Sequence, residues 1–326
     1  MIVPQYWAEG RIQQRNEGKQ VTVRRFGWSD VSQEEAQVHA DQRTAEALQR
    51  ILSGEKLERR ETTGVYNGAQ GVPIREEILD RREETILTRN SYGAACLNTP
   101  DVLFADIDFE TDTRQSGMLL LVVLILLAWL AVGSWLAFPK AVVISSFFIG
   151  IVFSGVITSA MQRATQSLRG GAEKVARTRI ARFAEKHPKW NLRVYRTPAG
   201  FRVLATHQRF RPEDPEVEEC FEALGTDPVY RVMCRNQHCF RARVSPKPWR
   251  IGIGDHLRIR PGIWPVSPDR VPQRNSWIER YESAAGSFAA CRFEESAGSG
   301  IVDSSILPVI EWHDELSRAT SGLPIA

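Results

Sequence analysis

The stretch Val102–Leu130, "VLFADIDFETDTRQSGMLLLVVLILLAWL", joins two different kinds of sequence. In its first part, apolar residues lead into Asp106 and Asp108, a pattern that predicts a buried strand ending in two acids. Its second part carries no charge from Gly117 onward and is typical of a membrane-spanning helix. The fold and the function both depend on how these two parts fit together.

Two uncharged runs follow the acid pair, at residues 118–138 and 141–161, and Pro139 and Lys140 separate them. At about 1.5 Å per residue, each run is long enough to cross a bilayer as a helix. The short connection makes the two helices antiparallel neighbours, so the sequence predicts a transmembrane hairpin over residues 117–161. The lipid bilayer is then an expected partner.

Basic residues set the expected orientation of this hairpin. Arg114 precedes the first run, several arginines and Lys174 follow the second, and the turn carries only Lys140. The positive-inside rule therefore places both flanks in the cytoplasm. We expect an integral protein of the inner or plasma membrane with both termini cytoplasmic. Residues 1–116 and 162–326 would be the two halves of one cytoplasmic domain.

Bulk properties narrow the class of protein only slightly. The chain has 326 residues and a formal net charge of +3, which is too small an excess to indicate nucleic-acid binding by itself. No apolar segment of the signal-peptide type opens the sequence. The five cysteines are odd in number and irregularly spaced, so reduced thiols are expected rather than a disulfide framework.

Outside the hairpin, the patterns predict mixed helices and strands. Ser32 and Glu35 form a capping-box pattern, which predicts a helix that ends at Gly54. The residues 197–200, Thr-Pro-Ala-Gly, lie between two strand-like runs and predict a β-hairpin. Further strands are expected at 84–89 and 102–108, and further helices at 168–186 and 215–224. The predicted class is an α+β cytoplasmic domain interrupted by a two-helix transmembrane hairpin.

The acid pair is the main candidate for chemistry. Because side chains alternate along a strand, Asp106 and Asp108 point to the same face. Two carboxylates at a strand end can bind Mg²⁺ or Mn²⁺, with phosphate oxygens completing the coordination. The alternative is that these acids only solvate the end of the strand.

Three short motifs in order resemble the archaeo-eukaryotic primase (primase-polymerase) superfamily: "VLFADID", "VYRTPAGFRVLATH" and "ALGTDPVYR". The resemblance covers roughly residues 102–250. It implies that Asp106 and Asp108 bind the metal and that Asp227 is a third catalytic carboxylate. Arg202 stands where the family has its nucleotide-binding histidine, which is a departure from the pattern. The resemblance implies that Arg202 or His207 holds the nucleotide phosphate.

A basic stretch follows the third motif and includes Arg241, Arg243, Lys247 and Arg250. These cations suit phosphate neutralisation, or else they form a solvated strand face. Arg241 and Arg243 are therefore included among the predicted nucleotide-binding residues. The resemblance implies a metal-dependent nucleotidyltransferase with nucleotides or nucleic acid as partners. The competing hypothesis is a non-catalytic, membrane-anchored scaffold or ligand sensor.

An acid pair after apolar residues also resembles the haloacid-dehalogenase phosphatases, but Phe109 and Glu110 follow it here in place of that family's Gly-Thr. The aromatic residues that stand among arginines either stack on bases or fill the core. A zinc site is the remaining candidate, and its ligands would be Cys220, Cys234, His238 and Cys239. The simpler interpretation is that these cysteines are buried free thiols.

Overall fold

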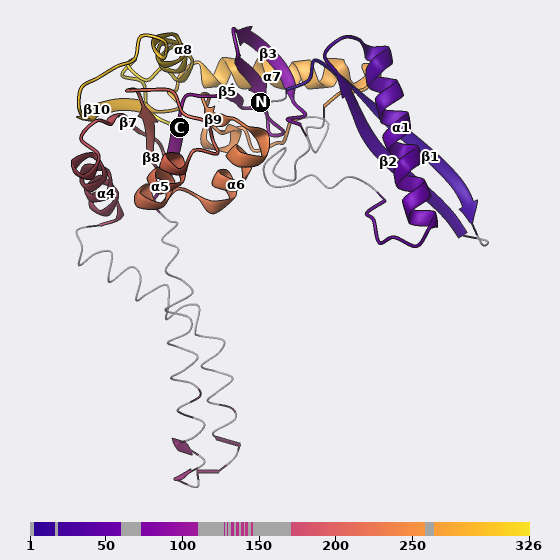
Figure 1. The fold of residues 1–326 in the computed structure, drawn as a ribbon, viewed down its shortest axis with the longest axis horizontal. Helices are drawn as coiled ribbons and strands as arrows, with labels where there is room; N and C mark the ends of the chain where they lie inside the picture. Colours follow the sequence, from indigo (N-terminus) through magenta and orange to yellow (C-terminus); the bar gives the residue numbers. More distant parts are fainter. Residues whose placement is uncertain are drawn as a thin grey trace.

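The computed structural model describes residues 3–16, 19–59, 73–109, 171–257 and 264–326, together with isolated residues between 127 and 145. These residues form one two-stranded and two four-stranded antiparallel sheets with helices packed against them. Figure 1 shows the two-stranded sheet and its helix at one end of the molecule, away from the larger sheets. The α+β part of the predicted fold class is confirmed.

The N-terminal unit consists of strands β1 (Tyr6–Asn16) and β2 (Lys19–Ser29) and helix α1 (Gln33–Leu52). The predicted capping residue is confirmed, because the Ser32 side chain accepts a hydrogen bond from the Glu35 backbone N–H at 3.2 Å. Glycine lets the helix lie directly on the hairpin. A Cβ atom at Gly27 would lie 2.1 Å from the backbone nitrogen of Ala40. The helix and the strands are therefore in backbone contact at this point.

The first large sheet has the strand order β10-β7-β8-β6. Strands β7 (Asn191–Arg196) and β8 (Gly200–Ala205) form the predicted hairpin, and β6 (Phe104–Asp108) pairs with β8. Strand β10 (Arg292–Gly298) completes the sheet on the other side of β7. The acid pair thus stands at the end of an edge strand.

The second large sheet has the strand order β3-β4-β5-β9. Its members are β3 (Glu77–Arg82), β4 (Thr85–Arg89), β5 (Ala95–Thr99) and β9 (Phe240–Arg243). Strand β9 arrives from a distant part of the sequence and pairs with β5. It also contacts β6, so that the second sheet borders the end of the first.

Helices cover both faces of the first sheet (Figure 1). On one side lie α4 (Ala172–Lys186) and α5 (Pro215–Leu224), and on the other lies α8 (Leu307–Ser317). Helices α6 (Pro228–Gln237) and α7 (Val271–Ala285) follow α5 and precede β10, respectively. One cluster of buried apolar residues runs through the first sheet, β5, β9 and four of these helices. This continuous core fixes the two large sheets to each other.

The predicted transmembrane hairpin is corrected. None of the helices that the structure describes is both long enough and apolar enough to cross a membrane. The two expected spans, 118–138 and 141–161, lie almost entirely outside the described residues. The integral-membrane localisation and the membrane-anchored alternatives rested on this hairpin, and they are not retained.

Candidate functional site

Strand β6 carries Asp106 and Asp108 two positions apart, so that both side chains lie on the same face of the strand. Phe104, Ala105 and Ile107 are buried, while Asp106 and Asp108 occupy alternate positions at its end. On the neighbouring strand β8, Arg202 is the register partner of Asp106, and Gly200 is the register partner of Asp108. The first acid therefore stands directly opposite a cation.

Asp106 and Arg202 form a two-pronged ion pair. The Arg202 Nε atom donates to Oδ1 of Asp106 at 2.8 Å, and its Nη2 atom donates to Oδ2 at 3.1 Å. Arg202 is only 2% exposed, and its Nη1 atom donates to the backbone carbonyl of Arg243 at 2.8 Å. Burial alone would lower the pKa of Arg202, but Asp106 raises it above its ordinary value. The guanidinium thus links β6 to β9.

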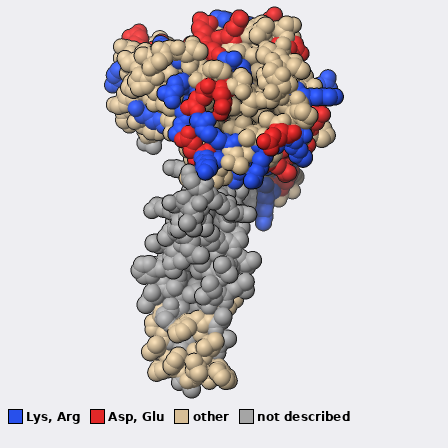
Figure 2. Space-filling view, turned by 90° about the vertical axis from the view of Figure 1, so that its left-hand side faces the viewer, with Lys and Arg blue, Asp and Glu red and all other residues tan. Residues whose placement is uncertain are grey.

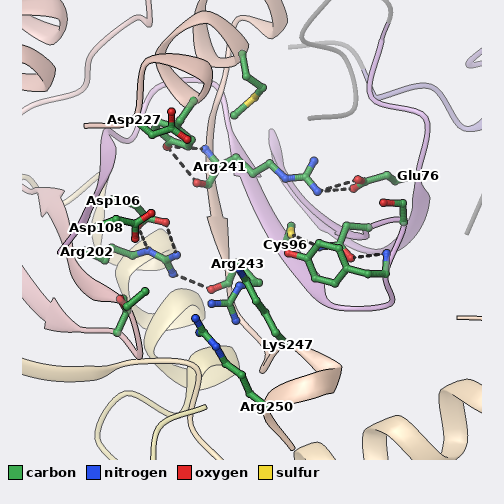
Figure 3. A pocket seen from close by; sticks show the side chains of 17 residues that line it. Glu76, Cys96, Asp106, Asp108, Arg202, Asp227, Arg241, Arg243, Lys247 and Arg250 are labelled. Carbon is green, nitrogen blue, oxygen red and sulfur yellow. Dashed lines mark hydrogen bonds and ion pairs between the residues drawn. The ribbon is translucent and has the colours of Figure 1, made fainter. Parts of the chain in front are cut away.

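A pocket of about 200 Å³ opens beside this ion pair (Figure 3). The end of β6 supplies Asp106 and Asp108, and Asp227 lies nearby at the start of α6. Strand β9 and the segment after it supply the cationic side of the pocket, which consists of Arg241, Arg243, Lys247 and Arg250. Elements that are more than a hundred residues apart in the sequence therefore meet in one cavity.

Three of these cations, Arg243, Lys247 and Arg250, form what we call the cationic cluster (Figure 3). Within the described residues, no salt bridge at contact distance involves any of the three, although the charge of Asp108 acts on Lys247 and Arg250. Desolvation lowers the pKa of Lys247, and the charges of Arg243 and Arg250 lower it further. The Nη1 atom of Arg250 is buried and has no hydrogen-bond partner in the part of the chain that the structure describes. Arg243 donates to the Ser245 carbonyl at 2.7 Å, so the unmet need for an acceptor in the cluster is that of Arg250.

Arg241 is held differently from the cationic cluster. Its Nη2 atom donates to both carboxylate oxygens of Glu76, at 2.8 and 2.7 Å. Thr88 also donates to Glu76, at 2.7 Å. The side chains of Arg241 and Glu76 are 11% and 3% exposed, respectively. Arg241 lines the pocket, but its charge is balanced inside the second sheet.

The two remaining acids differ in what surrounds them. Desolvation raises the pKa of Asp108, and the neighbouring charges of Asp106 and Asp227 raise it further. Asp227 is the N-cap of α6, and its side chain accepts a hydrogen bond from the Val229 backbone N–H at 2.9 Å. The three acids predicted from the sequence thus line the same pocket, in three different environments.

His207 is the predicted site residue that lies elsewhere. Its ring contacts those of Trp190 and Phe210, with centroids 4.7 and 5.3 Å away, and it does not line the pocket. Burial lowers the pKa of His207. The sequence analysis missed other residues of the pocket lining, among them Glu76, which precedes β3, and Asn90 and Tyr92, which lie between β4 and β5. No local pattern marks them, because only the pairing of β5 with β9 brings them there.

The predicted site for Mg²⁺ or Mn²⁺ stays a prediction. No group of three or more His, Cys, Asp or Glu side chains suited to a metal ion occurs in the described ranges. Of the acid pair proposed to bind Mg²⁺ or Mn²⁺, Asp106 has both oxygens engaged by Arg202. Because Arg202 occupies both oxygens of Asp106, the pair does not have the geometry of a two-carboxylate clamp. The zinc alternative is not formed either, since Cys220, Cys234 and Cys239 are buried free thiols and His238 is exposed.

Comparison with protein-family models, curated proteins and solved structures gave no match. The resemblance to the primase superfamily therefore stays a prediction. The function expected from it, nucleotidyl transfer or nucleotide binding by a two-span membrane protein, is not retained. No membrane-spanning helix is found among the described residues, and the expected metal-binding pair is engaged by Arg202.

Removing the charge of Asp106 and removing the charge of Asp108 should have different effects on the free energy of unfolding. We expect Asp106→Asn to lower the free energy of unfolding by about 2 kcal/mol, because it leaves a buried guanidinium without its counter-charge. The loss is smaller than for a fully buried pair, since the Asp106 side chain is 40% exposed. Urea unfolding at neutral pH measures this loss.

Asp108→Asn is the matched control. The raised pKa of Asp108 means that the folded protein disfavours its charged form, so removing this charge should cost no stability at neutral pH. As the pH falls through the raised pKa, Asp108 becomes protonated and the wild type should approach the variant. A larger loss for Asp108→Asn than for Asp106→Asn would contradict the ion-pair assignment.

Proposed function

We propose that the pocket binds a small ligand that carries a phosphate group. The observation that supports this most directly is the cationic cluster of Arg243, Lys247 and Arg250, which lines one cavity and forms no salt bridge at contact distance among the described residues. Like charges that are held together repel each other, and a bound anion removes that repulsion. Phosphate supplies both the charge and several strong acceptor oxygens.

Arg250 adds a specific need for an acceptor. Its buried Nη1 atom has no hydrogen-bond partner, although buried polar atoms are almost always paired. A phosphate oxygen in the pocket would supply the missing acceptor. The lowered pKa values of Lys247 and Arg250 have the same two causes, desolvation and neighbouring cations, and a bound anion would reverse both shifts.

The size of the pocket and the surface charge favour a small molecule over a polymer. A volume of about 200 Å³ is below the range that is usual for drug-sized ligands. On the face shown in Figure 2, Lys and Arg are intermingled with Asp and Glu and do not form one broad basic patch. A nucleic-acid surface would need such a patch. The cavity is instead lined by five cationic and four acidic side chains, and three of the cations form no salt bridge at contact distance among the described residues.

Calorimetric titration of the full-length chain with inorganic pyrophosphate tests this proposal. We expect saturable binding by the wild type that weakens as salt is added. The double variant Lys247→Gln/Arg250→Gln should bind about 100-fold more weakly, because each lost charge-assisted contact is worth about 1.5 kcal/mol.

The matched control is Lys189→Gln/Arg292→Gln, which removes the same net charge at exposed positions outside the pocket. This control should bind pyrophosphate like the wild type. The proposed function fails if the wild type does not bind, or if the two double variants lose affinity equally.

A further inference from the structure

A buried polar cluster lies behind the pocket, on the side of Arg202 that faces away from Asp106. Its members are Cys291, His313 and Asp314, of which the first two are completely buried. The His313 Nε2 atom lies 3.4 Å from Nη1 of Arg202 and 4.0 Å from Sγ of Cys291. The imidazole therefore touches the same guanidinium that holds Asp106.

The partners of His313 determine which ring nitrogen carries the proton in the neutral form. Its Nδ1 atom lies 3.0 Å from Oδ1 of Asp314, and a carboxylate can only accept a hydrogen bond. The proton therefore sits on Nδ1, and Nε2 is left as an acceptor. Because a guanidinium can only donate, the contact between Arg202 and Nε2 is consistent with this tautomer.

Asp314 is itself fixed by a second arginine. Arg193 on β7 donates to Oδ2 of Asp314 at 2.7 Å. The rings of Phe104 and Tyr195 pack against the imidazole, with centroid distances of 5.2 and 4.8 Å. His313 thus has a fixed orientation, with one nitrogen toward Asp314 and the other toward Arg202.

We propose that His313 is a positioning residue of the ligand pocket, whose Nε2 atom keeps Arg202 bridged between Asp106 and the Arg243 carbonyl. This inference rests on the proposed function, since ligand binding is its readout. Arg202 joins the acidic end of β6 to the strand that carries Arg243. If Arg202 loses its contact with His313, the distance between the end of β6 and the strand that carries Arg243 is no longer fixed.

The charge state of His313 links this role to pH. Titratable or charged groups face His313 from several elements: Arg202 on β8, Cys291 before β10, Asp314 on α8, and Tyr195 and Arg193 on β7. Asp106 on β6 affects His313 through its ion pair with Arg202. Burial alone lowers the pKa of His313, but Cys291 and Asp314 more than offset this, so the pKa is raised. Once protonated, Nε2 can no longer accept from Arg202. Anion binding should therefore weaken as the pH falls through this raised pKa.

Variants at position 313 separate positioning from simple packing. We expect His313→Leu to bind pyrophosphate about tenfold more weakly, since it loses the acceptor for Arg202. In His313→Gln, the amide oxygen can take the place of Nε2 and should restore most of the affinity. Trp312→Leu is the control, because it removes a neighbouring buried side chain of α8 whose ring contacts Arg82 instead of Arg202. It should destabilise the fold and leave the affinity unchanged.

Sulfate keeps a constant charge over the range of about pH 6 to 9, so its affinity reports the protein's own titration. The wild type should bind sulfate more weakly at the acidic end of this range, and His313→Gln should show no such step. Cys291→Ala should move the step to lower pH, because Cys291 raises the pKa of His313.

The outcomes separate the two proposals. Equal pyrophosphate affinity in the wild type and in His313→Leu would overturn the positioning role and leave the proposed function standing. The same holds if His313→Gln binds as weakly as His313→Leu, or if its pH step persists. No binding of either anion by the wild type would overturn the proposed function, and the positioning role with it.

Discussion

Glu76→Gln is expected to lower the free energy of unfolding by about 3–5 kcal/mol. Glu76 is the counter-charge of Arg241, and both side chains lie almost completely inside the second sheet. The substitution keeps the shape of the side chain but leaves a buried guanidinium without a negative partner. Thr88, which donates to Glu76, is also disturbed. Urea unfolding of the variant and the wild type measures the difference.

Glu9→Gln provides the comparison for this prediction. Glu9 also pairs with an arginine, Arg24 at 3.3 Å, but the side chains of Glu9 and Arg24 are 41% and 32% exposed. An exposed pair of this kind contributes at most about 1 kcal/mol. If Glu76→Gln cost no more than Glu9→Gln, the pair of Glu76 and Arg241 would not stabilise the second sheet in the way its burial indicates.

Gly200→Ala is expected to be the most damaging single substitution next to the pocket. A Cβ atom at this position would lie 1.8 Å from the backbone oxygen of Ile107 and 3.1 Å from Cα of Asp108. Backbone atoms cannot rotate away, so the end of β6 would have to move and carry Asp108 with it. We expect a loss of about 3 kcal/mol in the free energy of unfolding, at the upper end for overpacking. Pyrophosphate affinity should fall at least tenfold.

Gly254→Ala is the matched substitution for this experiment. Apart from its chain neighbours, no atom of the described residues lies within 4 Å of a Cβ built at Gly254, so this variant should keep both wild-type stability and wild-type affinity. Unfolding in urea and calorimetric titration are measured on the same two proteins. A Gly200→Ala protein that matched Gly254→Ala in both would show that β6 and β8 do not approach each other as closely as described.

Local patterns in the sequence were sufficient for the elements that build the site. The helix after Ser32, the hairpin at 197–200 and the strand that carries Asp106 and Asp108 were all predicted, because caps, turns and side-chain alternation act over a few residues. The placing of both acids toward one pocket followed from the same alternation. These predictions needed no knowledge of distant parts of the chain.

The pairing of charges could not be predicted in this way. The sequence motifs predict that Arg202 is a phosphate ligand. The strand register instead places Arg202 opposite Asp106, and the two side chains form an ion pair. Arg241 was interpreted in the same way, and its partner Glu76 lies 165 residues away in the sequence. The sequence shows how many cations a segment has, but only tertiary pairing shows which of them stay unbalanced. Among the described residues, Arg243, Lys247 and Arg250 are the pocket cations that form no salt bridge at contact distance.

The five buried cysteines can report local unfolding of the elements around them. All five are free thiols and all five are buried, so a thiol reagent in the solvent reaches each one only when the element around it opens. The rate of labelling at each position then reports a local opening, a partial one or complete unfolding, without any introduced label. The reporters are spread over both large sheets and the helices between them: Cys96 on β5, Cys220 on α5, Cys234 on α6, Cys239 before β9 and Cys291 before β10.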